Sequence, residues 1–228
     1  MTDTKQRIIG VSETLFFEQG IANIRLQQIA DAAEISVGNL AYHFKNKDAI
    51  VVAVYENLFS ELSNILSQFL MYNQLDGFDK QFSALYNFYK QNNFTFNNLW
   101  EIERNYPEIQ QEWLSTANKV LLQFKKRIEY NVQNGRFKPE PWKGSYDSLA
   151  QNLLLNVNCW IPQQMLRNKP INESLYKKHL WGMLYFIFTD KGKNEFEQRL
   201  FWTGIDDRGL ELEIAGVEFE EEILVIHV

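Results

Sequence analysis

The chain has 228 residues, of which 45% are hydrophobic and 14% aromatic, a composition that excludes an intrinsically disordered protein. One cysteine and three histidines exclude a disulfide scaffold and a cysteine-rich zinc module, so we expect no metal site and no cofactor. The net charge of −6 does not exclude a nucleic-acid partner, because the last 26 residues hold eight acids and one base and the other 202 residues carry a net charge of +1.

Helical periodicity runs through most of the chain and predicts an all-α fold. Proline is scarce, and apolar residues recur three and four positions apart. The expected helices cover residues 3–19, 25–33, 36–44, 47–72, 78–91, 94–104, 107–133, 145–167, 172–190 and 193–202. The longest apolar run, residues 49–55, is far shorter than the ~20 residues of a membrane span, and the first residues carry no signal-peptide core. We therefore expect a cytoplasmic protein without a membrane partner.

Residues 25–44 carry the most specific pattern, that of a helix-turn-helix. Two short amphipathic helices are joined by a turn at residues 34–36, in which Ser36 is a suitable N-cap for the second helix. The residues expected to point inward are Leu26, Ile29, Ala30, Ala33, Leu40, Ala41 and Phe44. A longer first helix braces the pair, so this is a three-helix unit whose second short helix would enter the DNA major groove.

The stretch from Gly20 to Lys47 reads G-x5-L-x2-I-A-x4-I-S-x-G-N-L-x-Y-H-F-K-N-K and resembles the DNA-binding domain of TetR-type (tetracycline-repressor-like) regulators. The sequence departs from that family at Glu34, which stands where glycine is usual in the turn. This departure implies either a distorted turn or a left-handed backbone at Glu34. The resemblance implies a regulator that binds DNA as a homodimer and responds to a small molecule.

Eight residues on or near the motif are candidates for contact with DNA. They are Arg25, Gln27, Val37, Gly38, Asn39, Tyr42, His43 and Lys47. The side-chain amides of Gln27 and Asn39 suit two hydrogen bonds to an adenine edge, and Val37 suits a thymine methyl group. Gly38 permits close approach of the backbone. Two of these four residues have a second interpretation that involves no DNA. Val37 also fits a core position, and Gln27 also fits a solvated helix surface.

The other four candidates suit the phosphate backbone, whose contacts fix register rather than sequence. Arg25, Tyr42 and His43 share this expectation, although Tyr42 also fits a partly packed position. Lys47 begins the fourth helix after Asn46, a suitable N-cap, so its ammonium and the helix-end amides are expected to hold one phosphate together.

Residues 78–133 are unusually aromatic, which is typical of a packed core and also of an apolar ligand pocket. The candidate pocket residues are Tyr86, Tyr89, Phe96, Trp100, Glu101 and Asn156. No cluster of arginine or lysine accompanies these aromatic residues, so a mostly apolar small-molecule effector is expected.

The expected helices over 145–167 and 172–190 are apolar on more than one side and need cover on two sides. A second subunit supplies that cover in our interpretation, so we predict a homodimer through residues 145–190, with Trp181 and Leu184 in the interface. Beyond them, apolar and acidic residues alternate in residues 210–219, which predicts a short β-hairpin in the acidic tail.

These patterns predict a helix-turn-helix DNA-binding domain over residues 1–47, a helical effector-binding and dimerisation domain over 48–202, and an acidic tail over 203–228. The predicted function is a transcriptional regulator, more specifically a repressor, that binds a palindromic double-stranded DNA operator and is released by its effector. The alternative is a helical small-molecule sensor or carrier without DNA binding. We expect no enzyme and no catalytic residues, because a Gly-rich phosphate loop, a G-x-S-x-G elbow and an H-E-x-x-H motif are all missing.

Overall fold

The computed structural model describes residues 4–92 and 105–200, and all regular secondary structure in these two ranges is helical. The elements are α1 (Thr4–Gln19), the 3-10 turn η1 (Ile21–Asn23), α2 (Leu26–Ala32), α3 (Val37–His43), α4 (Lys47–Gln68), α5 (Leu75–Gln91), α8 (Pro107–Gln133), α9 (Ser145–Leu166), α10 (Glu173–Tyr185) and α11 (Asp190–Leu200). The predicted all-α fold is confirmed. The predicted helix over 94–104 and the predicted hairpin in the tail lie outside the described residues.

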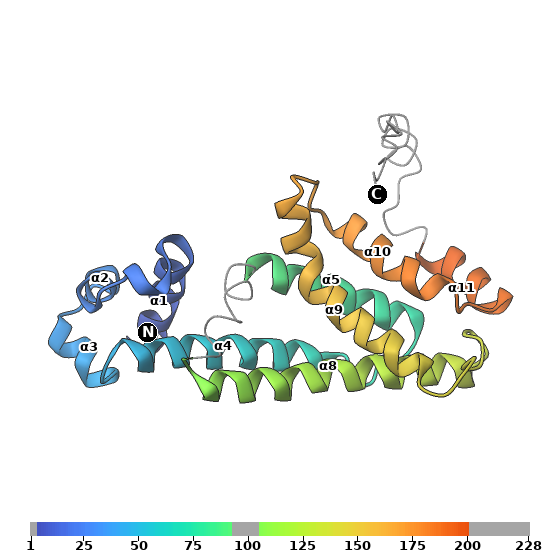
Figure 1. Ribbon diagram of the computed structural model, residues 1–228, viewed down its shortest axis with the longest axis horizontal. Helices are drawn as coiled ribbons and strands as arrows, with labels where there is room; N and C mark the ends of the chain where they lie inside the picture. The colour runs from blue at the N-terminus through green and yellow to red at the C-terminus, as the bar shows by residue number, and fades with distance from the viewer. Residues whose placement is uncertain (1–3, 93–104, 201–228) are drawn as a thin grey trace, which may run out of the picture.

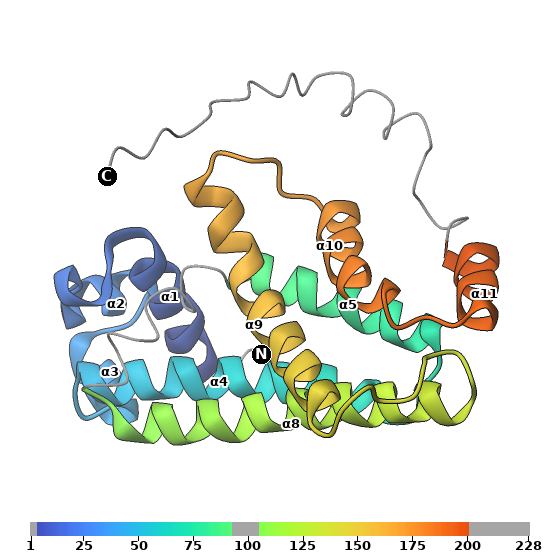
Figure 2. The same cartoon turned by 45° about the vertical axis from the view of Figure 1, so that its right-hand side comes forward.

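The helices form a small cluster and a larger bundle that share α4 (Figure 1). Helices α1, α2 and α3 gather around the first turns of α4, whereas α5, α9 and α10 lie over its far half and α11 lies beyond its end, beside α5. In both views α4 and α8 run side by side along the length of the molecule (Figure 2). Helix α4 therefore belongs to both parts and connects them.

Helix α4 is the central element of this arrangement. Its buried residues include Ile50, Val54, Leu58 and Leu62, which recur four positions apart and face the neighbouring helices α1 and α8. By length and hydropathy α4 also passes the test for a membrane-crossing helix, and half of its apolar window is buried inside the fold. Such burial is typical of a core helix.

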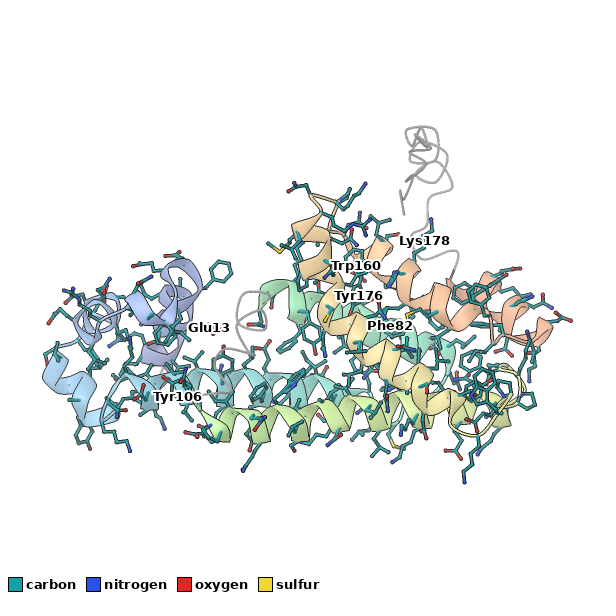
Figure 3. All side chains as sticks on the ribbon, in the orientation of Figure 1. Glu13, Phe82, Tyr106, Trp160, Tyr176 and Lys178 are labelled. Atoms are coloured by element: carbon teal, nitrogen blue, oxygen red, sulfur yellow. The ribbon has the colours of Figure 1, made fainter. Side chains whose placement is uncertain are left out.

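Aromatic side chains fill the core between α5, α8 and α10. The rings of Phe78 and Phe82 on α5 lie 5.5–6.2 Å, centroid to centroid, from Trp181 on α10 and Phe124 on α8. Phe82 is seen deep in the bundle in Figure 3. Aromatic pairs at such separations contribute ~0.5–1.5 kcal/mol beyond the burial of their area. Much of the aromatic-rich stretch is therefore packed core.

Two buried ionic groups fix the helices of the bundle. The carboxylate of Asp79 on α5 accepts a hydrogen bond from the ammonium of Lys177 on α10 at 2.5 Å. On α8, the fully buried guanidinium of Arg127 donates to the carbonyl oxygens of Phe69 and Tyr72, at 2.5 and 3.1 Å, and so closes the C-terminal end of α4. Burial lowers the pKa of Arg127 to about 10, which leaves it cationic at neutral pH.

The prediction of one helix over 172–190 is wrong at its C-terminal end. The chain leaves the helix at residues 186–189, where the ring of Phe188 packs against Phe137 with 5.0 Å between centroids. The hydroxyl of Thr189 then accepts a hydrogen bond at 3.1 Å from a backbone N–H in the first turn of α11. Packing against a distant residue and a new N-cap therefore override the local helical pattern.

The prediction that Trp181 and Leu184 face a second subunit is also wrong. Trp181 is 5% exposed and Leu184 is fully buried in the core of one chain. The periodicity identified apolar faces but did not say which neighbour covers each face. The large apolar residues that do remain exposed on α9 and at the end of α10 are Leu155, Met165, Leu166, Tyr185 and Phe186.

Candidate nucleic-acid interface

A tight turn between α2 and α3 sets the geometry of the helix-turn-helix. Glu34 has φ 54°, so the structure adopts the left-handed backbone, one of the two predicted alternatives. The N–H of Ile35 donates to the carbonyl of Ala30 at 3.0 Å, which closes the end of α2. The N–H of Asn39 donates to the hydroxyl oxygen of Ser36 at 3.1 Å, so Ser36 caps α3 as predicted.

One face of α3 packs into the small cluster. Leu40 and Phe44 are buried there, in agreement with the sequence. Ala41 was predicted to point inward and is instead exposed. The correction follows from the length of α3, because seven residues make only two turns and offer few inward positions.

The other face of α3 is presented to solvent. Val37 is 36% exposed and Tyr42 is 85% exposed, so neither is a core residue. Gly38 and Asn39 are exposed beside them, and the half-buried ring of His43 lies edge-on to the ring of Tyr42 with 5.2 Å between centroids. The structure therefore brings five predicted DNA-binding residues onto one short, accessible helix.

Helix α2 adds two more of the predicted residues, both exposed. The side-chain amide of Gln27 donates to the carboxylate of Asp31 at 2.7 Å, which fixes its orientation. Arg25 precedes α2, and its backbone N–H donates to the side-chain oxygen of Gln28 at 2.8 Å. Gln28 thus closes the start of α2.

Lys47, the eighth predicted residue, is the first residue of α4 and is half-buried. Its ammonium points back into the small cluster. It donates to the carbonyl oxygens of Ile21 at 2.9 Å and Ile24 at 3.0 Å, with Ala22 at 3.5 Å. Asn46 caps α4, as predicted, by accepting from the N–H of Ala49 at 2.9 Å.

The predicted effector-pocket residues do not come together around a described cavity. Tyr86 and Tyr89 are buried on α5, where the ring of Tyr86 packs on Tyr176 at 5.4 Å (Figure 3 labels Tyr176), and burial raises the pKa of Tyr89. Asn156 is half-buried on α9, with its oxygen 2.7 Å from the ring of His179. The other three, Phe96, Trp100 and Glu101, lie outside the described residues.

A shallow cavity of about 120 Å³ lies between α4 and the start of α8. It is lined by Val52, Tyr55, Glu56, Phe59, Glu108, Ile109, Gln111 and Glu112. Its volume is below the ~300–1,000 Å³ of small-molecule sites. Sequence reasoning did not single out its three carboxylates, because Glu56 meets Glu108 and Glu112 only through the packing of two distant helices. Within residues 4–92 and 105–200 no group of three His, Cys, Asp or Glu side chains is placed to hold a metal ion.

Comparison with known proteins covers both parts of the chain. Residues 8–54 match the family described as bacterial regulatory proteins, tetR family, and residues 54–196 match the bacterial transcriptional repressor family TetR. The HTH-type transcriptional regulator QacR of Staphylococcus aureus (strain Mu50) is 41% identical over 61 residues, which are 27% of this chain and 28% of QacR. The chain thus matches about a quarter of the length of this curated relative.

Solved structures extend the similarity to the whole fold. A TetR-family transcriptional regulator from Marinobacter aquaeolei VT8 superposes with a TM-score of 0.71 and 19% identity, over 84% of this chain and 93% of that chain. The TetR-family regulator PfmR from Thermus thermophilus superposes with a TM-score of 0.66 and 17% identity, over 78% of this chain and 97% of that chain. The helix-turn-helix cluster and the helical bundle therefore occur together in known folds.

Proposed function

This chain belongs to the tetR family of bacterial regulatory proteins, and on that premise we propose that it is a cytoplasmic transcriptional repressor that binds a two-fold symmetric operator as a homodimer. The observation that carries the proposal is the exposed face of α3, above all Tyr42, an aromatic residue that is 85% exposed. A recognition helix presents such a face to DNA, with base contacts in the major groove and further contacts to the phosphates beside it. The family consists of regulators, in agreement with the expectation that the chain is not an enzyme.

We assign the exposed residues of the motif to two kinds of contact. Asn39 and Gln27 read base edges, Val37 meets a thymine methyl group, and Gly38 permits close approach. Arg25, Tyr42 and His43 bind phosphates and set the register of α3 in the groove. Both kinds are needed, because phosphate contacts supply affinity without sequence preference.

The homodimer is proposed to form through α9 and α10, within residues 145–190. Leu155 in the middle of α9 is 59% exposed, and Leu166 and Phe186 at the ends of the two helices are more exposed still. Large apolar side chains left exposed along two neighbouring helices favour a protein interface there. Two-fold symmetry then places two α3 helices against half-sites about one helical turn of DNA apart.

The bundle of residues 48–202 is proposed to bind a mostly apolar small-molecule effector, near Tyr86 and Tyr89. Effector binding there is expected to change the position of α4, which runs from the bundle into the small cluster (Figure 1). The effector shifts the equilibrium only by its difference in affinity for the two positions. A sensor or carrier without DNA binding fits less well, because it gives no role to the exposed face of α3.

Selection from random double-stranded DNA tests the function directly. The full-length protein is incubated with a random duplex library at about 0.15 M salt, and bound sequences are recovered and compared. We expect one enriched motif with two inverted half-sites about 10 base pairs apart, centre to centre. A matched selection with Tyr42→Ala keeps the same motif at lower yield, since Tyr42 is assigned to phosphate. Recovery of no enriched motif by the native protein would contradict the proposal.

A further inference from the structure

The ammonium of Lys47 makes two hydrogen bonds of ordinary length and a longer third contact within the protein. An ammonium has three N–H donors and no acceptor. The three donors meet the carbonyl oxygens of Ile21, Ile24 and Ala22, at 2.9, 3.0 and 3.5 Å. These carbonyls lie on or directly after η1, the single turn that connects α1 to α2. A phosphate oxygen that binds this ammonium therefore competes with these carbonyls for its donors.

The η1 turn needs such a donor. A short 3-10 turn leaves carbonyl oxygens at its end without partners from its own backbone. Among the described residues, the one backbone donor to the carbonyls of Ile21, Ala22 and Ile24 is the N–H of Ile24. It reaches the carbonyl of Ile21 at a long 3.4 Å. The positive charge of Lys47 also compensates the negative end of the turn. Lys47 thus closes η1 as a cap supplied from 23–26 residues further along the chain.

We propose that Lys47 is a positioning residue for DNA recognition, which clamps η1 to the first turn of α4 and so holds the α2–α3 unit at the angle that fits the groove. This inference rests on the proposed DNA-binding function, and it replaces the phosphate contact that the sequence alone predicts for Lys47. The clamp holds the α2–α3 unit at both of its ends. Residues 44–46 join α3 to Lys47 through the chain, and η1 leads directly into α2.

Two substitutions separate a clamp from a phosphate ligand. Lys47→Met keeps the length of the side chain and removes the charge and all three donors. Lys47→Arg keeps the charge, and its planar guanidinium suits a phosphate at least as well, but it cannot direct three compact donors at three carbonyls. Lys45→Met is the matched control, because Lys45 is an exposed lysine two residues earlier whose side chain makes no hydrogen bond or ion pair with the described residues.

The experiment measures the affinity of each full-length variant for the selected operator and for a scrambled duplex, over a range of salt concentrations well below the melting temperature. For a clamp, Lys47→Met and Lys47→Arg each lower the ratio of operator to scrambled affinity on the order of ten-fold. The dependence of log affinity on log salt stays unchanged in Lys47→Arg, and Lys45→Met keeps the native ratio. A role in stability alone does not move this ratio in folded protein.

The opposite pattern overturns the proposal. If Lys47 binds phosphate, Lys47→Arg keeps the native ratio, and Lys47→Met reduces the salt slope by about 0.9 per lysine, or about 1.8 per dimer, with the ratio unchanged. Amide hydrogen exchange of residues 20–26 is a second test, and it needs no DNA. Exchange there is faster in both Lys47 variants if the clamp exists, and native exchange rates would reject it. If the native protein selects no operator, the proposed function fails while this second measurement still decides whether the clamp exists.

Discussion

The hydroxyl of Tyr106 donates a 2.8 Å hydrogen bond to the carboxylate of Asp48, and so joins the N-terminal end of α8 to the second residue of α4. Figure 3 shows Tyr106 beside the end of α4 that carries α1–α3. Burial, and then the hydrogen bond to Asp48, raise the pKa of Tyr106 to about 12, so the hydroxyl keeps its proton at physiological pH. The first turn of α4 therefore contacts η1 through Lys47 and the bundle through Asp48.

This hydrogen bond predicts an energetic coupling between the two helices. A double-mutant cycle of Tyr106→Phe and Asp48→Asn, followed by denaturant unfolding, is expected to give a coupling energy of about 0.5–1.5 kcal/mol. Tyr130→Phe, at the other end of α8, is the control for loss of a hydroxyl, since that hydroxyl bonds to no described residue. Effects that add within about 0.3 kcal/mol would show that the contact is not energetically coupled.

A second prediction concerns two carboxylates between α1 and α4. Burial, and then repulsion from Glu61, raise the pKa of Glu13. An acid whose pKa is higher in the folded state than in the unfolded state stabilises the fold at low pH, and that contribution is lost as pH rises through the folded pKa. We therefore expect Glu13→Gln to raise the free energy of unfolding at pH 7, by a few tenths of a kcal/mol up to ~1 kcal/mol because solvent screens the pair.

The same substitution is expected to have almost no effect at about pH 3 and below, where the carboxylate is protonated in both states. Thermal unfolding over about pH 3–8 measures this, with Glu18→Gln as the control for an exposed acid on the same helix. A stabilisation that grows as pH falls would have the wrong sign for this explanation.

The motif was readable from sequence because its determinants are local. The turn at Glu34 and the caps at Ser36 and Asn46 involve groups within five residues of one another, and the 3.6-residue period shows which side of α2 is buried. The exposed face of α3 follows from the same period, with Ala41 as the error.

The remaining features depend on partners that are distant in the chain. Tyr106 and Asp48 are 58 residues apart, and the carbonyls that hold Lys47 are 23–26 residues away. Phe188 leaves its helix because Phe137 packs against it. An amphipathic pattern states that a face is buried but not by what, which is why Trp181 was assigned to a subunit interface rather than to the core.

A third prediction tests the dimer. Leu155→Glu places a charge in the proposed α9–α10 interface and is expected to shift the protein from dimer to monomer with little change in helix content. Leu114→Glu is the matched control, since Leu114 on α8 is 54% exposed, close to the 59% of Leu155, and lies outside the proposed interface. Sedimentation equilibrium at micromolar concentration checks both. A stable native monomer would contradict the dimer, and equal dissociation of both variants would place its interface elsewhere.

The last prediction separates base readout from phosphate contact on α3. The side chain of Asn39 bonds to no described residue, and only its backbone N–H takes part in the Ser36 cap, so Asn39→Ala is expected to melt like the native protein. It should lose ~1–3 kcal/mol of discrimination at one base pair in each half-site and keep its affinity for scrambled DNA. Tyr42→Ala should lower the affinity for operator and for scrambled DNA alike, because a phosphate contact carries no sequence information. Affinities for a set of single-base operator variants, at one fixed salt concentration, measure both effects. If Asn39→Ala leaves every base preference intact while Tyr42→Ala alters one, the assignments of the two residues are reversed, and α3 lies in the groove with a rotation different from the one inferred from its exposed face.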